Sequence, residues 1–299
     1  MIHIPFVRNI KFEVGKRHSL SPLVSRVMAD NSGPFTYTGT GVFIIGTKEL
    51  AIIDPGPITP AHKKALNAAL KGKSLTHIFL THHHADHSPM ATVLAKKHGC
   101  RIYGLSPKDT GSDPDAVELE AGIDKNFAPD IQINHGQMFH GPEWTLEALH
   151  TPGHTSNHVC FALHQENTLF SGDHIMGWAT SVVIPPDGNM RQYLRSLRDI
   201  QKLNFSTIRP THGAAIQDVV PFIKAYIDHR LARELQILAA VQAGHSNVMD
   251  MVHHIYTDID KRLYPAAALS VLSHLIHLVE RDKIKCKGKL TLSGNYTPL

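Results

Sequence analysis

Short apolar runs separated by turn residues dominate the first two thirds of the chain. Runs of roughly four to eight apolar residues between turns are typical of buried strands. Strands are therefore predicted at 23–29, 41–46, 50–53, 77–80, 101–104, 131–133, 144–150, 158–163, 168–171 and 207–209. Helical patterns interrupt them at 59–71, 88–98 and 189–203. Residues 106–130 are predicted to be a loop with a short helix near 114–121. Runs of strands with helices between them indicate an α+β protein with two sheets and helices outside.

The pattern changes after Gly213, where longer stripes of apolar residues recur at helical spacing. Three helices and then a tight hairpin are predicted, at 219–241, 248–255, 272–279 and 284–292. Two short helices followed by a hairpin resemble a winged-helix unit. We therefore divide the chain into a first domain at 1–216 and a helical, winged-helix-like domain at 217–299.

One polar cluster lies where a predicted strand ends and a predicted helix begins. The segment Thr81–His87 reads THHHADH. His82 and His84 are two residues apart, so an extended backbone points both side chains the same way. Asp86 and His87 follow one short turn later and can face the same space. Imidazoles and a carboxylate together form a ligand set that borderline metals such as zinc accept.

Because the chain contains 23 histidines, a histidine-rich surface loop is the simplest alternative for this cluster. Three downstream motifs favour a metal site, since each places a ligand type directly after an apolar, strand-like segment. These motifs are Thr151-Pro152-Gly153-His154, Ser171-Gly172-Asp173 and Pro210-Thr211-His212-Gly213.

The ordered set His82-x-His84-x-Asp86-His87, His154, Asp173 and His212 resembles the ligand pattern of the metallo-β-lactamase superfamily. The resemblance implies an αβ/βα sandwich and two divalent metal ions. Zinc is the expected metal, with manganese or iron as alternatives. His82, His84 and His154 would hold one ion, Asp86, His87 and His212 would hold the other, and Asp173 would bridge both.

The resemblance also implies a reaction. Two metals about 3.5–4 Å apart polarise the scissile group and lower the pKa of a shared water toward about 7, so a metal-bridging hydroxide would be the nucleophile. Asp86, which would orient that hydroxide, and the bridging Asp173 would be the catalytic carboxylates.

Three further residues are weaker candidates. Asp54 ends a predicted strand, and the resemblance implies that it supports a metal-binding histidine from behind, although an Asp-Pro-Gly turn explains it equally well. His158 lies four residues after His154 and either lines the site or packs beside it. Thr180 lies near Trp178 in the loop after Asp173, where substrate contact and simple loop packing are both open.

Composition narrows the class of protein without naming a substrate. The hydrophobic content of 42% and the charged content of 19% are typical of a soluble globular protein. The net charge of +4 permits an anionic partner without requiring one. Three widely spaced cysteines predict no disulfide framework and fit a reducing compartment. With no apolar leader and no run near about 18 apolar residues, we expect a cytoplasmic protein without a membrane partner. The sequence gives no indication of the oligomeric state.

Three functions remain open. The runs GPFTYTGTG and SGDHIMG and the C-terminal extension look most like the beta-lactamase-like protein 2 family, which includes a single-strand-specific endoribonuclease. The seven ligands are also shared with glyoxalase II thioesterases. The chain is therefore expected to hydrolyse single-stranded RNA or a small ester or thioester, or else to be a non-catalytic module that binds nucleic acid or protein. Asp173 argues against an antibiotic-hydrolysing enzyme, where that position usually lacks a bridging carboxylate.

Basic residues gather near the C-terminus. Arg281, Lys283, Lys285, Lys287 and Lys289 stand against a single acid, Asp282. Such a segment favours a phosphate backbone held by charge. Lysines on an exposed edge strand are the alternative, since they also prevent chains from pairing edge to edge.

Overall fold

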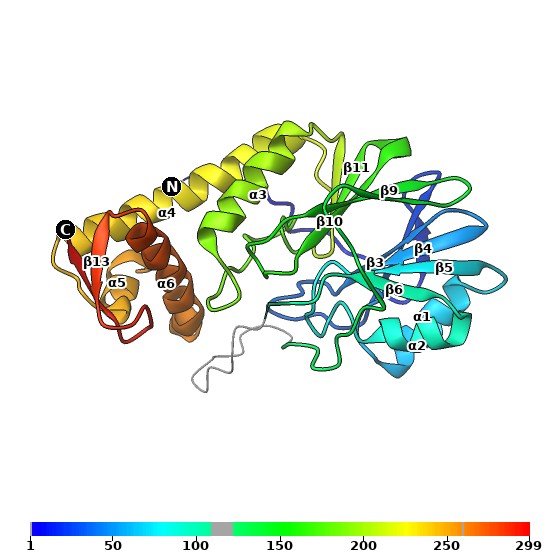
Figure 1. Ribbon diagram of the computed structural model, residues 1–299, viewed down its shortest axis with the longest axis horizontal. Coiled ribbons are helices and arrows are strands. Elements are labelled where there is room, and N and C mark those ends of the chain that lie inside the picture. The colour runs from blue at the N-terminus through cyan, green and yellow to red at the C-terminus, as the bar shows by residue number, and fades with distance from the viewer. Residues whose placement is uncertain (1, 109–121, 259) are drawn as a thin grey trace.

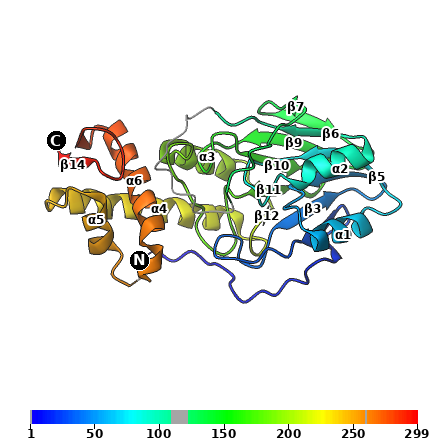
Figure 2. The same cartoon turned by 90° about the horizontal axis from the view of Figure 1, so that it is seen from below.

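The structure is a computed structural model, and it describes residues 2–108, 122–258 and 260–299. Two β-sheets face each other, helices cover both outer faces, and a separate helical unit lies beyond one side of the sandwich (Figure 1, Figure 2). This architecture confirms the predicted αβ/βα sandwich with a helical C-terminal unit.

The first sheet contains seven strands that lie side by side in chain order. They are β1 (Arg17–Ser19), β2 (Val24–Met28), β3 (Gly41–Ile45), β4 (Glu49–Ile53), β5 (Ser74–Phe79), β6 (Arg101–Gly104) and β7 (Ile131–Gln132). The pairs from β1 to β4 are antiparallel, whereas those from β4 to β7 are parallel.

The second sheet contains five strands in the order β12-β11-β10-β9-β8. They are β8 (Gln137–His140), β9 (Thr145–His150), β10 (Val159–Leu163), β11 (Thr168–Gly172) and β12 (Thr207–Pro210). Only the β11–β12 pair of this sheet is parallel.

The central strands are buried on both faces, which explains their unbroken apolar runs. In β10, Phe161 and Leu163 pack between the two sheets, whereas Cys160 and Ala162 pack outward under the covering helices. The strand β4 alternates in the same way. Ala51 and Ile53 face the other sheet, whereas Leu50 and Ile52 face α1 and α2. One residue of register slip would exchange these two environments.

Four helices pack against the outer faces of the two sheets. Two of them, α1 (Pro60–Ala69) and α2 (Met90–His98), cover the outer face of the first sheet. The helix α3 (Met190–Lys202) and the first half of α4 (Val219–Gln242) cover the second sheet. The α1 helix begins as predicted, because Thr59 accepts a hydrogen bond from the backbone of His62 and Pro60 needs no partner for a backbone N–H.

The C-terminal unit is built on the second half of α4, which runs out of the sandwich as one continuous helix (Figure 1). A separate core forms there between α4, α5 (Val248–Ile255), α6 (Tyr264–Glu280) and the strand β13 (Ile284–Lys287). The last strand, β14 (Asn295–Pro298), pairs antiparallel with β13. Short 3-10 turns span His164–Glu166 and Lys261–Leu263.

Several predictions differ from the structure. The hairpin predicted within 284–292 is wrong, because β13 pairs with 295–298 and residues 288–294 form the connection. Two strands of the sandwich were not predicted, β1 and β8, which are outer strands of their sheets and have mixed burial. The short helix predicted near 114–121 lies outside the described residues.

One helical stretch, Lys261–Glu280, is long and apolar enough to cross a membrane by length and composition, with a mean hydropathy of 1.3. Just over half of it, 56%, is buried inside the protein. Its residues Val271 and Leu275 belong to the core of the C-terminal unit. Since a core helix passes the same test, this stretch is weak evidence for a membrane span.

Candidate metal centre

The seven residues singled out in the sequence converge on one end of the sandwich. His82, His84, Asp86 and His87 follow β5 of the first sheet. The other three, His154, Asp173 and His212, follow β9, β11 and β12 of the second sheet. All except the half-buried His84 are buried. The site therefore lies where loops from both sheets meet.

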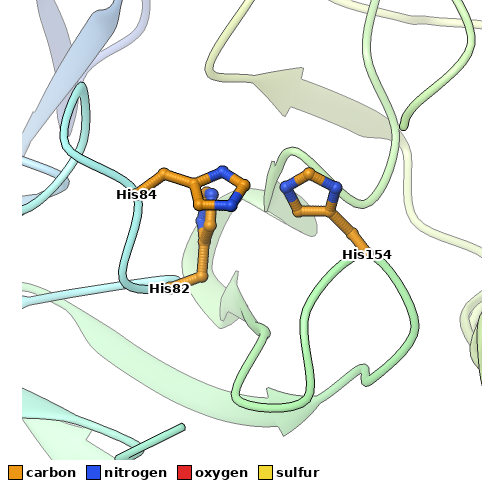
Figure 3. Close-up of side chains that lie close together, drawn as sticks. All are labelled: His82, His84 and His154. Atoms are coloured by element: carbon orange, nitrogen blue, oxygen red, sulfur yellow. The ribbon is translucent and has the colours of Figure 1, made fainter. Parts of the chain in front are cut away.

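Three overlapping groups bring their ligand atoms within 4.8 Å of one another. They are His82, His84 and His154; His82, His87 and Asp173; and Asp86, His87 and His212. Figure 3 shows the first group, in which two imidazoles from the loop after β5 face a third from the opposite loop. The ring centroids of His82 and His84 lie 4.5 Å apart, and each is 4.9 Å from that of His154.

The two carboxylates face the second half of the cluster. The Oδ2 atom of Asp86 is 3.1 Å from Nε2 of His212 and 3.3 Å from Nε2 of His87. Asp173 directs Oδ1 toward His212 and Oδ2 toward His87, each at 3.5 Å. Asp173 also forms a group with His82 of the first set and His87 of the third, so its carboxylate lies within reach of both sets.

Oxygen acceptors fix the tautomer of four of the imidazoles. Nδ1 of His154 lies 2.6 Å from the carbonyl of Val182, and Nδ1 of His212 lies 3.2 Å from that of Gly39. A carbonyl accepts only, so both Nδ1 atoms carry the proton. The same reasoning applies to His87, whose Nδ1 donates to a carboxylate oxygen of Asp54 at 2.9 Å.

The fourth imidazole, His82, is held through a hydroxyl. Thr81 donates its hydroxyl proton to Asp54 Oδ2 at 2.7 Å, so its oxygen accepts the Nδ1 proton of His82 at 2.9 Å. In all four rings Nε2 therefore faces the interior of the site, where it can bind a metal ion or a proton. Metal-binding histidines are oriented in this way by the atoms behind them.

Asp54 is the hub of this support. Besides contacting His87, it accepts the backbone N–H of Thr81 through Oδ1 at 2.8 Å. Its backbone adopts a positive φ of 48°, and it is only 1% exposed. The carboxylate thus ties the loop after β5 to the end of β4, which places Asp54 where the sequence analysis expected it, behind a candidate ligand.

The residues fit a divalent cation. His82 Nε2 and Asp173 Oδ1 are buried and have no hydrogen-bond partner among the described residues. Buried polar atoms are rarely left in this state unless an ion or water satisfies them. Unprotonated imidazole nitrogens and carboxylate oxygens are also the donor set that zinc, manganese and iron accept.

The charges of the site show the same demand for a cation. Burial opposes protonation of His87, but Asp86, Asp173 and Asp54 outweigh burial and raise the pKa of His87 well above its ordinary value. Burial likewise opposes ionisation of Asp173, but His212 and His87 lower its pKa to about 2. The carboxylates are therefore ionised and attract positive charge into a buried space.

Two other histidines near the site, His158 and His83, have hydrogen-bond partners of their own. Nε2 of His158 accepts the backbone N–H of Asp173 at 3.2 Å, and its Nδ1 contacts the hydroxyl of Thr151 at 2.9 Å. His158 therefore packs beside the site and holds the backbone of Asp173. His83 points away from the ligands and contacts Asn157 through Nδ1 at 2.8 Å.

A pocket of about 80 Å³ opens beside Asp86, Asp173 and His212. Its walls come from two loops, and they are Pro34, Phe35, Thr36, Met176, Trp178, Ala179, Thr180 and Val182. The predicted contact residue Thr180 is therefore at the pocket. Trp178 lines it as well and stacks on Tyr37, with ring centroids 4.9 Å apart and an interplanar angle of 10°.

Sequence reasoning missed several supporting groups. The hydroxyl of Thr40 donates to Asp86 Oδ2 at 3.2 Å, and the carbonyls of Gly39 and Val182 orient two histidines. Backbone carbonyls leave no mark in a sequence, and Thr40 lies far from the ligand motifs. Thr81, by contrast, is adjacent to His82 and was within reach of the motif analysis.

Comparison with known proteins identifies the family. The model described as the metallo-beta-lactamase superfamily matches residues 37–212, and that of the beta-lactamase associated winged helix domain matches residues 248–291. A beta-lactamase-like protein 2 homolog of Drosophila melanogaster is 34% identical over 286 residues, which cover 92% of this chain and 91% of that protein. An atrochrysone carboxyl ACP thioesterase of Aspergillus terreus is 31% identical over 245 residues, which cover 79% of this chain and 66% of that protein.

Solved structures share the fold at lower identity. A beta-lactamase domain protein from Burkholderia ambifaria has a TM-score of 0.81 at 16% identity, covering 97% of this chain and 96% of that one. A metallo-beta-lactamase family protein from Thermus thermophilus has a TM-score of 0.76 at 21% identity, and the match covers 94% of this chain and 100% of that one. The chain is a member of the metallo-beta-lactamase superfamily of hydrolases, with a candidate metal site and a C-terminal winged-helix domain.

Proposed function

We propose that this protein is a dinuclear metal-dependent thioesterase. The observation that carries the proposal is the lining of the pocket beside the candidate metal ligands. In the described part of the chain, no lysine or arginine lines this pocket, and its walls beyond the ligands are apolar or carry a hydroxyl. Relatives named as acyl carrier protein thioesterases support the same choice.

The residues that line the pocket suit a thioester substrate better than a phosphodiester. A phosphodiester brings a formal negative charge, and sites for such groups usually supply arginine or lysine beside the metals. A thioester carbonyl is neutral, and an acyl group suits walls such as Phe35, Met176 and Trp178. The pocket therefore favours the neutral substrate.

The chemistry of the leaving group also favours a thioester substrate. The titratable side chains in the described lining are Asp86, Asp173 and His212, and all three are candidate metal ligands. No other acid lines the pocket among these residues to protonate an alkoxide or an amine as it departs. A thiolate, whose conjugate acid has a pKa of about 8.5, leaves without such help.

Bound divalent metals would supply polarisation of the carbonyl and a water of lowered pKa. The chain's own residues have separate tasks. His82, His87, His154 and His212 present Nε2 lone pairs in fixed directions. Asp86 and Asp173 hold negative charge in the buried space. Phe35 and Trp178 exclude water from the side where an acyl group would lie.

A parallel assay tests the proposal. The protein, loaded with zinc or with manganese, is incubated with acyl thioesters of coenzyme A and of glutathione, with single-stranded RNA and with a β-lactam. We expect metal-dependent release of thiol and at least 100-fold lower turnover for Asp173→Ala, by analogy with the loss of other catalytic groups. Hydrolysis of RNA with no release of thiol from any thioester would reject the proposal.

The ribonuclease alternative keeps one observation in its favour. Lys283, Lys285, Lys287 and Lys289 are exposed at the C-terminal hairpin. Arg281 is different, because its guanidinium, although the side chain is 45% exposed, donates to Glu234 Oε1 at 2.7 Å. Four exposed cations can attract a phosphate backbone, and the RNA arm of the assay addresses that reading.

A further inference from the structure

The loop that forms one wall of the pocket is held from α4, the helix that continues into the winged-helix domain. We propose that two buried residues of α4, Tyr226 and Arg230, position His154 for metal binding by fixing the backbone of the loop 174–182. The inference rests on the metal site proposed above, but it concerns residues outside the ligand set and outside the pocket lining.

Tyr226 anchors the first part of this loop. Its hydroxyl accepts the backbone N–H of Met176 at 3.1 Å and lies 2.5 Å from the carbonyl of Ala179 and 2.8 Å from that of Met176. A hydroxyl has one proton, so the shorter contact, to Ala179, is the better donor bond. Tyr226 is fully buried and holds two points of the pocket wall at once.

Arg230 anchors the second part, one helical turn later. Its guanidinium donates to the carbonyl of Ser181. The next carbonyl along the chain, that of Val182, accepts the Nδ1 proton of His154 at 2.6 Å. A displaced Ser181 would therefore turn the acceptor that sets the direction of the His154 Nε2 lone pair.

The burial of Arg230 supports a positioning role for its contact with Ser181. Arg230 is only 5% exposed. Its guanidinium donates to the Ser181 carbonyl, and its guanidinium carbon lies 5.5 Å from the ring centroid of Tyr193. Its charge also acts on His229 and His274, and no carboxylate among the described residues forms an ion pair with it. Arginine is rarely buried without such a partner, because desolvating its charge is costly.

The next turn of α4 fixes the helix itself. Glu234 is buried and accepts a hydrogen bond from Nδ1 of His277 at 2.6 Å and one from Arg281 at 2.7 Å, both on the α6 side of the C-terminal unit. Residues 226, 230 and 234 are spaced by four, so they share one face of the helix. The same face therefore holds the pocket loop at one end and the winged-helix unit at the other.

Metal affinity of the purified protein, measured by competition with a chromophoric chelator, tests the inference without any substrate. We compare Tyr226→Phe and Arg230→Met with the wild type, with Arg230→Lys as the conservative rescue. Lys224→Met is the matched control, because Lys224 is an exposed cation on the same helix whose ion-pair partner among the described residues is Asp228.

We expect Arg230→Met to weaken the binding of one metal equivalent by about 10-fold, as the loss of supporting contacts usually does, with partial recovery in Arg230→Lys. Tyr226→Phe should weaken it in the same direction, and Lys224→Met should not. Wild-type affinity for both equivalents in folded Arg230→Met and in Tyr226→Phe would overturn the inference. If Arg230→Met does not fold, Tyr226→Phe decides by the same measurement. A wild type that binds two metals but hydrolyses no thioester would refute the proposed function alone.

Discussion

At the scale of single residues, the site is built from groups that each hold one atom of a neighbour in place. Asp54 is the clearest case, since its two oxygens serve Thr81 twice and His87 once. An aspartate at this position is more than a turn residue, because its carboxylate decides which nitrogen of His87 carries the proton. We therefore expect a substitution of Asp54 to lower metal affinity more than substrate affinity.

We expect Asp54→Ala to lower metal affinity by about 10- to 100-fold. It should also destabilise the fold by roughly 1–3 kcal/mol, because the buried Thr81 N–H loses its acceptor. Chelator competition and urea unfolding measure the two effects. Asp30→Ala is the control, as Asp30 is exposed and its hydrogen bond is to the Thr59 hydroxyl, away from the candidate ligands. Equal metal affinity in the two variants would show that Asp54 does not support His87.

Gly153 shows the same dependence on a single position. Its φ is +145°, and an added Cβ would lie 2.3 Å from the Cα of Tyr193 on α3. We expect Gly153→Ala to cost about 2 kcal/mol or more, since α3 must move and His154 moves with the loop. Gly72→Ala is the control for backbone strain without a steric clash. Gly72 also has a positive φ, +72°, but a Cβ added there would have no atom within 4 Å. A urea midpoint for Gly153→Ala no lower than that for Gly72→Ala would refute the collision.

At the scale of elements, α4 and α6 enclose a buried set of titratable side chains. Burial opposes ionisation of Glu234, but the imidazoles of His274, whose Nδ1 lies 3.7 Å away, and of His277, which is hydrogen-bonded to it, outweigh burial and lower its pKa to about 2. Burial of His274 itself lowers its pKa to about 4 from an ordinary 6.5. The interface between these helices is therefore sensitive to acid.

The sign of this sensitivity follows from proton binding. Between pH 6.5 and 4 the unfolded chain takes up a proton at His274 that the folded chain does not, so stability falls as the pH falls through this window. We expect His274→Leu to reduce the loss of unfolding free energy between pH 7 and pH 5 by up to roughly 2 kcal/mol. Urea unfolding at both pH values measures it, with the exposed His254→Ala as control. An unchanged pH dependence in His274→Leu would contradict the expectation.

Elements differed in how well the sequence predicted them. The central strands carry unbroken apolar runs because both faces are buried, so β3, β4, β10 and β11 were predicted within a residue or two. The outer strand β8 has alternating exposure and looks like a loop. The partner of β13 was misplaced, since nothing in the local pattern of 288–294 distinguishes a turn from a longer connection.

The candidate site was predictable to the extent that its residues stand in motifs. The ligand set follows strand ends in chain order, and a sequence retains that information. The supports from Gly39, Thr40 and Val182 depend on which loops meet in space. The roles of Tyr226 and Arg230 were hidden for the same reason, because both read as ordinary positions of a long helix.

At the scale of the whole molecule, the exposed cations of the hairpin and the apolar pocket belong to different parts of the protein. We expect the triple variant Lys285→Glu, Lys287→Glu and Lys289→Glu to keep the wild-type kcat/KM for a thioester within about twofold, because none of the three lines the pocket. If single-stranded RNA binds at the hairpin, its affinity should fall and the salt slope should shrink by about 2, at ~0.7 per lost phosphate contact.

Titration of labelled RNA at low and moderate salt, beside the thioester assay, measures both quantities. A large loss of thioester turnover in the triple variant would place the hairpin in the reaction and contradict the separation of the two parts. Unchanged RNA affinity and salt slope would remove the hairpin from any account of nucleic-acid binding.

The candidate ligands come from both sheets, four from the loop after β5 and three from loops of the opposite sheet. A bound ion would therefore act as a cross-link, and its binding free energy would add to the stability of the folded chain. At a free metal concentration 100 times the dissociation constant, the gain is about 2.7 kcal/mol. We expect Tm to rise with the logarithm of free zinc and to fall on chelation, as measured by differential scanning fluorimetry. An identical Tm with zinc and with chelator would contradict this. The melting curve then becomes a gauge of cofactor occupancy, from which affinities for zinc, manganese and iron can be ranked before any substrate is known.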